Sequence, residues 1–178
     1  MLSRMLSAAL FGIDATIVRV EAHGSSGLPA VNTVGLPDSA VRESRERVRS
    51  AIINSGFTYP QKRITVNLAP ADIRKAGSSL DLPVAVAIVA LNEGALAEPI
   101  QETTLLMGEL SLDGAIRPVP GTLSVALEAR SLGLKRLVVP AANTLEASVV
   151  RGIEVVPVSS LSEAIGVLNG SPGAPATF

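Results

Sequence analysis

Cysteine is absent from this sequence of 178 residues, and histidine occurs once, as His23. Without cysteine the chain can form no disulfide, and thiolate catalysis and most zinc sites are excluded. A single histidine provides neither a histidine cluster for a metal nor strong support for a histidine-based catalytic triad. We therefore expect no metal site in this chain.

Aromatic residues are also scarce. They make up 2% of the sequence, with no tryptophan and one tyrosine, which argues against base recognition by rows of stacked aromatic rings. The formal net charge is −1, so there is no overall attraction to nucleic acid or to a membrane. Any basic binding surface must therefore be local.

The apolar fraction of 47% and the length of the chain indicate one domain with a well-filled core. Residues 82–91 form the longest apolar run, which is much shorter than the roughly 20 residues that span a bilayer. Near the N-terminus, serines alternate with apolar residues, which favours a strand over a signal peptide. We expect a cytoplasmic protein without membrane association.

Hydrophobic periodicity predicts a mixed sheet with helices packed on it, followed by a small parallel α/β part. The expected strands are residues 7–12, 15–23, 30–35, 62–68, 104–112, 115–119, 136–139 and 154–158. The expected helices are residues 38–55, a buried helix from Asp81, 122–132, 145–150 and 161–168. We assign residues 1–168 to one α+β domain, with subregions of about 1–119 and 120–168. Residues 169–178, rich in Gly, Pro and Ala, are predicted as a linker or tail.

The segment of residues 74–90 combines two cations, a Gly-Ser-Ser elbow and the buried helix. Asp81 is predicted as the N-cap of that helix, with Pro83 in its first turn. The elbow is either a plain loop or a segment that presents a serine hydroxyl. Lys75 precedes this flexible loop, so we expect it to be solvated and protonated, which makes a local Ser–Lys pair a poor prediction.

Basic residues are concentrated in two places. Arg42, Arg45 and Arg49 fall on one face of the helix predicted from Asp38, at spacings of three and four residues. This face is either solvated, with Glu43–Arg47 and Arg42–Glu46 pairs, or a row of arginines that contacts phosphates. A second candidate cluster consists of Lys62, Arg63, Arg74 and Lys75.

The common sequence motifs of enzymes are missing. There is no Gly-x-x-x-x-Gly-Lys-Ser/Thr, so the sequence contains no P-loop. Rossmann, His-Glu-x-x-His and Gly-x-Ser-x-Gly motifs are absent too.

Two stretches resemble the Lon-type proteases. Residues 75–79, Lys-Ala-Gly-Ser-Ser, resemble their serine motif, and residues 108–119, Gly-Glu-Leu-Ser-Leu-Asp-Gly-Ala-Ile-Arg-Pro-Val, resemble their second motif. The resemblance places Ser79 at the nucleophile's position. Leu123, however, stands where those proteases have the lysine that acts as the base, and Asp81 replaces a small glycine. The resemblance therefore implies the fold but argues against protease activity.

A second resemblance covers nearly the whole chain. The stretches Val34-Gly35-Leu36-Pro37-Asp38, residues 41–49 and Asn67-Leu68-Ala69-Pro70-Ala71-Asp72 look like the N-terminal domain of the ComM/YifB group, which is often labelled magnesium chelatase-like. This resemblance implies a ribosomal protein S5 domain 2-like, Lon-protease-like fold. It also implies that full-length members carry an AAA+ module, which would bind ATP and Mg²⁺, and form hexameric rings that act as DNA helicases in branch migration, recombination and competence.

Three functional hypotheses follow. The first is a non-catalytic domain that assists ring assembly and contacts DNA weakly through the two basic clusters. The second is a residual serine hydrolase that uses Ser79, and the third is a purely structural oligomerisation domain. We expect no cofactor in this chain, and magnesium chelation has no support from its residues.

Overall fold

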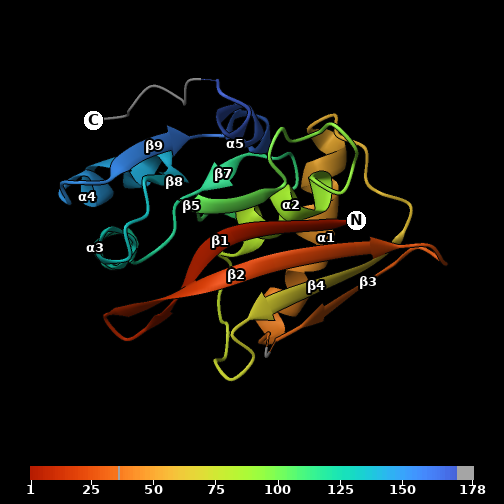
Figure 1. The fold of residues 1–178 in the computed structure, drawn as a ribbon, viewed down its shortest axis with the longest axis horizontal. Coiled ribbons are helices and arrows are strands. Elements are labelled where there is room, and N and C mark those ends of the chain that lie inside the picture. The colour runs from red at the N-terminus through yellow and green to blue at the C-terminus, as the bar shows by residue number, and fades with distance from the viewer. Residues whose placement is uncertain (36, 172–178) are drawn as a thin grey trace.

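The computed structural model describes residues 1–35 and 37–171, which are built around a seven-stranded sheet (Figure 1). The strands lie in the order β3-β4-β2-β1-β5-β8-β9. Their bounds are Leu2–Phe11 for β1, Asp14–Ser25 for β2, Ala30–Val34 for β3, Arg63–Ala69 for β4, Ile100–Leu106 for β5, Arg136–Pro140 for β8 and Glu154–Val158 for β9. A separate two-stranded sheet pairs β6 (Glu109–Leu110) with β7 (Ile116–Arg117).

The large sheet is mixed and mostly parallel. The pairs β3–β4, β1–β5, β5–β8 and β8–β9 are parallel, whereas β1–β2 and β2–β4 are antiparallel. The predicted mixed sheet with helices on it is confirmed, and the predicted small parallel part continues the same sheet through β8 and β9. Strand β3 forms one edge of this sheet.

Helices cover both faces of the sheet and create two cores. Helices α1 (Ser39–Asn54), α2 (Asp81–Val89) and α5 (Leu161–Leu168) pack on one face, where α2 is almost entirely buried. Helices α3 (Thr122–Ser131) and α4 (Thr144–Ser148) bury Val125, Ala126 and Ala147 against the other face. A 3₁₀ turn, Ala141–Asn143, leads into α4.

Several local predictions are confirmed. β1 and β2 form the predicted hairpin, and the Asp113-Gly114 turn joins β6 to β7. Asp38 caps α1, because its carboxylate accepts a hydrogen bond of 2.9 Å from the backbone N–H of Val41. The alternating pattern of β4 places Ile64, Val66 and Leu68 in the core, as expected for a strand with one buried face.

The single strand predicted for residues 104–112 is wrong. It divides into β5 of the large sheet and the short β6, because the backbone of Gly108 bonds away from the sheet. The N–H of Met107 still donates to the carbonyl of Val138 in β8, whereas the N–H of Gly108 donates to the carbonyl of Ser79. The chain therefore leaves β5 and docks at the start of α2.

The prediction of Asp81 as an N-cap is also wrong. Leu80 is at the N-cap position, and Asp81 is the first residue of α2. Its carboxylate instead accepts hydrogen bonds from the Arg47 guanidinium, at 3.1 and 3.2 Å, and from the Leu110 N–H, at 3.0 Å. One buried carboxylate thus joins α1, α2 and β6.

Part of the predicted linker is attached to the domain. Asn169 follows α5, its side-chain oxygen accepts a hydrogen bond from the Ala97 N–H, and its amide donates to the Ala95 carbonyl. Residues 172–178 of that linker lie outside the described residues.

Within the described ranges, the helices are too short or insufficiently apolar to cross a bilayer.

Candidate nucleic-acid interface

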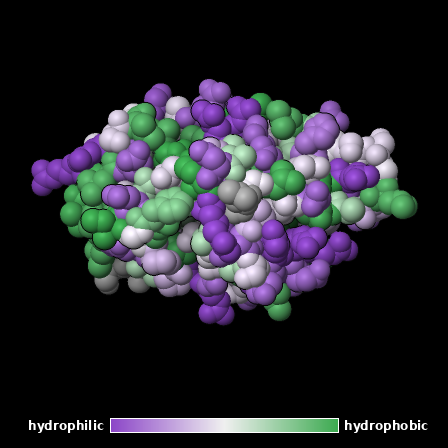
Figure 2. Space-filling model, turned by 90° about the horizontal axis from the view of Figure 1, so that it is seen from below, coloured by the Kyte–Doolittle hydropathy of each residue, from purple (hydrophilic) through white to green (hydrophobic). Residues whose placement is uncertain are grey.

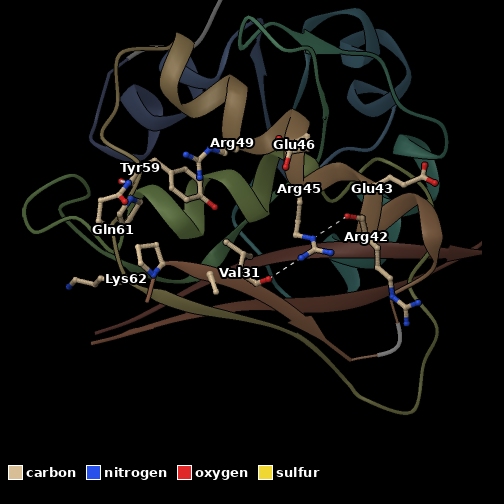
Figure 3. A pocket seen from close by; sticks show the side chains of 12 residues that line it. Val31, Arg42, Glu43, Arg45, Glu46, Arg49, Tyr59, Gln61 and Lys62 are labelled. Atoms are coloured by element: carbon tan, nitrogen blue, oxygen red, sulfur yellow. Dashed lines mark hydrogen bonds between the residues drawn. The ribbon is translucent and has the colours of Figure 1, made fainter. Parts of the chain in front are cut away.

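A basic groove of about 590 Å³ lies between the edge strand β3 and helix α1 (Figure 3). Four cations and two carboxylates line it, so the formal charge of the groove is +2, whereas the whole chain carries −1. We call it the β3–α1 groove. Its lining residues are Pro29, Ala30, Val31, Arg42, Glu43, Arg45, Glu46, Arg49, Tyr59, Pro60, Gln61 and Lys62.

The amphipathic pattern of α1 positions the arginines. Val41, Val48 and Ile52 are buried against the sheet and α2, which leaves the arginines at positions 42, 45 and 49 exposed. The structure therefore brings together the three arginines of the predicted row. It adds Lys62 to them, because the loop between α1 and β4 returns along the groove.

Arg45 lies in the middle of the groove and contacts the sheet edge. Its Nη1 donates a hydrogen bond of 3.1 Å to the carbonyl oxygen of Val31 in β3 (Figure 3). This bond occupies a backbone acceptor of an edge strand, where an open carbonyl could otherwise pair with another chain. Of the three arginines in the row, Arg45 is thus the one whose side chain is bonded to the sheet edge.

Arg49 lies over the aromatic ring of Tyr59 at one end of the groove (Figure 3). The distance from the guanidinium carbon to the ring centroid is 4.9 Å, which is within the range of a cation–π interaction. Burial raises the pKa of Tyr59, and the charges of Arg49 and Arg45 act in the opposite direction. The residue pattern did not single out Tyr59, because a lone aromatic residue in a loop carries no motif.

The predicted ion pairs along α1 do not form. In residues 1–35 and 37–171 the ion pairs are Arg4–Glu21 and Arg47–Asp81, so Arg47 bonds a buried carboxylate instead of Glu43. None of the groove cations is neutralised by an ion pair within this described part of the chain. Figure 3 shows the Glu43 side chain pointing away from the centre of the groove.

The second predicted cluster is not a cluster. Lys62 belongs to the β3–α1 groove, and Arg63 begins β4, whereas Arg74 and Lys75 follow the other end of that strand. The two pairs lie toward opposite ends of β4, whose seven residues span about 20 Å.

Lys75 is fully buried, contrary to the prediction that it is solvated. Its ammonium group donates to the carbonyl oxygen of Pro70, within the loop that connects β4 to α2. Loss of hydration lowers the pKa of Lys75, and the charge of Asp72 opposes this shift. The polar composition of the loop gave no indication that it folds over the lysine.

The positions that resemble the Lon serine and lysine do not form a catalytic pair. Ser79 precedes α2 and is half-buried, and its carbonyl oxygen accepts the Gly108 N–H at 3.0 Å. Leu123 lies in the first turn of α3 with 37% of its surface exposed. Among the hydrogen bonds of the described residues, none joins Ser79 to a lysine.

The fold and the groove together define a class: a mixed α/β domain with a basic cleft at a sheet edge. Residues 20–143 match the family model described as subunit ChlI of Mg-chelatase, and the chain belongs to this family.

Relatives with similar sequences share most of the chain. The protein YifB of Escherichia coli K12 is 47% identical over 151 residues, which cover 85% of this chain and 29% of YifB. The competence protein ComM of Haemophilus influenzae is 38% identical over 174 residues, or 98% of this chain and 34% of ComM. A Lon protease of Neorickettsia sennetsu is 24% identical over 161 residues, or 84% of this chain and 19% of that protease. The chain thus spans about a third or less of the length of these curated relatives.

Proposed function

We propose that this chain is a non-catalytic Lon-like domain that serves a ComM-like DNA helicase of the AAA+ type in ring assembly and DNA contact. In this proposal the fold is of the S5 domain 2-like, Lon-protease-like type. ATP and Mg²⁺ would bind the AAA+ module of a full-length, hexameric, cytoplasmic protein. The similarity to the competence protein ComM supports the proposal, as does the weaker similarity to a Lon protease.

The positive charge of the β3–α1 groove is the main observation that supports contact with DNA. Four cations converge on one concave surface of a chain whose net charge is −1. Clustered cations at a groove attract phosphates even when the whole protein has little net charge. Within the described residues none of the four cations forms an ion pair with a carboxylate, so their charge is not neutralised.

An exposed apolar surface supports the role in ring assembly. Ile13, in the turn between β1 and β2, is 87% exposed, and Leu127 of α3 lies across a shallow hollow from it. Figure 2 shows hydrophobic side chains gathered at the left, the side where Figure 1 places α3 and this turn. Exposed apolar patches of this kind are typical of protein contacts.

Neutralising the two arginines at the ends of the row is expected to weaken DNA binding. We predict that the double variant Arg42→Gln/Arg49→Gln binds a fluorescent oligonucleotide about tenfold more weakly in anisotropy titrations at low salt. The dependence of affinity on salt should also become shallower by about one for each lost phosphate contact. The matched control is Arg151→Gln, which removes an exposed charge in the turn between α4 and β9.

Equal binding by the double variant, the control and the wild-type protein would show that DNA contact does not use the groove. If none of the three bound at low salt, the purely structural alternative would be favoured.

The non-catalytic part of the proposal predicts that Ser79 does not react with serine-directed probes. Lys75 is hydrogen-bonded to Pro70, and Leu123 has no ionisable group, so neither supplies a base to the serine hydroxyl. A fluorophosphonate probe should therefore label the wild-type protein no more than Ser79→Ala. Labelling that disappears in Ser79→Ala would instead support the residual hydrolase.

A further inference from the structure

We propose that the β3–α1 groove binds single-stranded rather than double-stranded DNA, with the Arg49–Tyr59 pair as a platform on which one base stacks. This inference rests on the proposed function, because it specifies the form of DNA that the groove accepts.

Strand β3 restricts the space in front of the arginine face of α1. A helix that reads duplex DNA inserts an open face into the major groove, which is about 12 Å wide. The arginine face of α1 is not open, because Arg45 reaches the Val31 carbonyl of β3 at 3.1 Å. Strand β3 therefore stands beside this face and prevents it from entering a duplex groove. A single strand does not need a face open to that width, because it can lie along the groove over the Arg45 side chain.

The cations are spread from one end of the groove to the other. In Figure 3, Lys62 lies at the end near Tyr59, and Arg42 lies at the opposite end. Arg42 and Arg49 are seven residues apart, so about 10 Å of helix separates them. Cations spaced along a narrow groove can follow the phosphates of one strand.

The Arg49–Tyr59 pair provides the platform for a base. The only tyrosine of the sequence lies in the groove, with the Arg49 guanidinium 4.9 Å from its ring centroid. Arg49 is exposed, so its guanidinium group is accessible from solvent while it lies over the ring. Nucleic-acid bases stack on arginine planes as well as on aromatic rings, and this interaction requires a base that is not already stacked in a duplex.

Charge-conserving variants test the platform separately from the charge. Arg49→Lys keeps the cation and removes the plane, so we expect it to bind an oligothymidine of about ten nucleotides at least fivefold more weakly. Arg151→Lys, the same substitution at an exposed arginine outside the groove, is the matched control and should bind the same oligonucleotide within about twofold of the wild type. Neither variant is expected to change the weaker binding of a duplex of equal length.

Tyrosine fluorescence provides an independent readout, because the chain has one tyrosine and no tryptophan. We expect oligothymidine to quench the emission of Tyr59 in the wild-type protein, and the duplex to leave it unchanged after correction for absorption.

Four results would overturn the inference. If Arg49→Lys binds single strands as the wild type does, while Arg42→Gln/Arg49→Gln does not bind, the groove contacts DNA through charge alone and the proposed function survives. Tighter binding of the duplex would also overturn it. Displacement of the oligonucleotide by an oligoglutamate of equal charge, at equal concentration, would show that the groove recognises only negative charge. If no form of DNA binds at low salt, the proposed DNA contact fails together with the inference.

Discussion

Replacing Arg47 by alanine is expected to lower the free energy of unfolding by about 3 kcal/mol near neutral pH. The substitution leaves the Asp81 carboxylate, whose side chain is 1% exposed, without its charged partner. Removing one member of a buried ion pair costs about 3–5 kcal/mol, and we take the lower end because the Arg47 side chain is 32% exposed. Urea unfolding followed by far-UV circular dichroism measures this change.

The penalty in Arg47→Ala should depend on pH. In the wild-type protein, burial raises the pKa of Asp81, while hydrogen bonds from Arg47 and from the Leu110 N–H lower it. Without Arg47 the pKa of the folded state rises further above the ordinary value of about 3.9. At pH values between the ordinary pKa of the unfolded chain and the raised pKa of the folded variant, the folded state binds more protons than the unfolded state. The stability of the variant therefore falls as pH increases through this range. Below the ordinary pKa the penalty should be smallest.

The double variant Arg47→Ala/Asp81→Asn provides the control. An asparagine oxygen can still accept the Leu110 N–H, and it carries no charge that needs a partner. We expect the double variant to be more stable than Arg47→Ala at neutral pH and to lack the additional dependence on pH. A double variant that is no more stable than Arg47→Ala would contradict the role given to the buried charge.

Replacing Gly35 by alanine is expected to destabilise the fold by at least about 3 kcal/mol. Gly35 follows β3 with φ of +103°, and a Cβ atom built on it would overlap the carbonyl oxygen of Leu68. An alanine there combines unfavourable backbone geometry with a collision against backbone atoms that cannot rotate away. The same unfolding experiment measures the loss.

The variant Gly133→Ala separates the cost of the backbone conformation from the cost of the collision. Gly133 has φ of +77°, but nothing lies within 4 Å of the place where its Cβ would be. This variant should therefore lose only about 1 kcal/mol, the usual cost of a side chain in the left-handed region. Equal losses in the two variants would contradict the close packing of Gly35 on β4.

Local patterns predicted much of the fold. The period of β4, the Asp38 cap and the Asp113-Gly114 turn each depend on a few neighbouring residues, and each is confirmed. The break between β5 and β6 could not be predicted in this way. It depends on the hydrogen bonds that Gly108 makes with Ser79 and Leu82, which are distant in the sequence.

The site was predicted only in part for the same reason. Helical spacing placed Arg42, Arg45 and Arg49 together, because positions on one helix face follow from the sequence alone. The partner of Arg47, the burial of Lys75 and the position of Tyr59 depend on how distant elements pack. A charge pattern within one helix therefore suggested pairs with neighbouring glutamates, whereas packing brought Arg47 to a carboxylate of another helix.

A two-dimensional NMR titration would locate DNA in the β3–α1 groove residue by residue. A ¹⁵N-labelled sample of this chain would be titrated with the oligothymidine at low salt. We expect the backbone amide shifts to change mainly along residues 42–49 of α1 and at residues 59, 61 and 62 of the adjoining loop. The amides of α3 and α4 should remain unchanged. Changes confined to α3, α4 or the turn between β1 and β2 would contradict this expectation, and so would an unchanged spectrum.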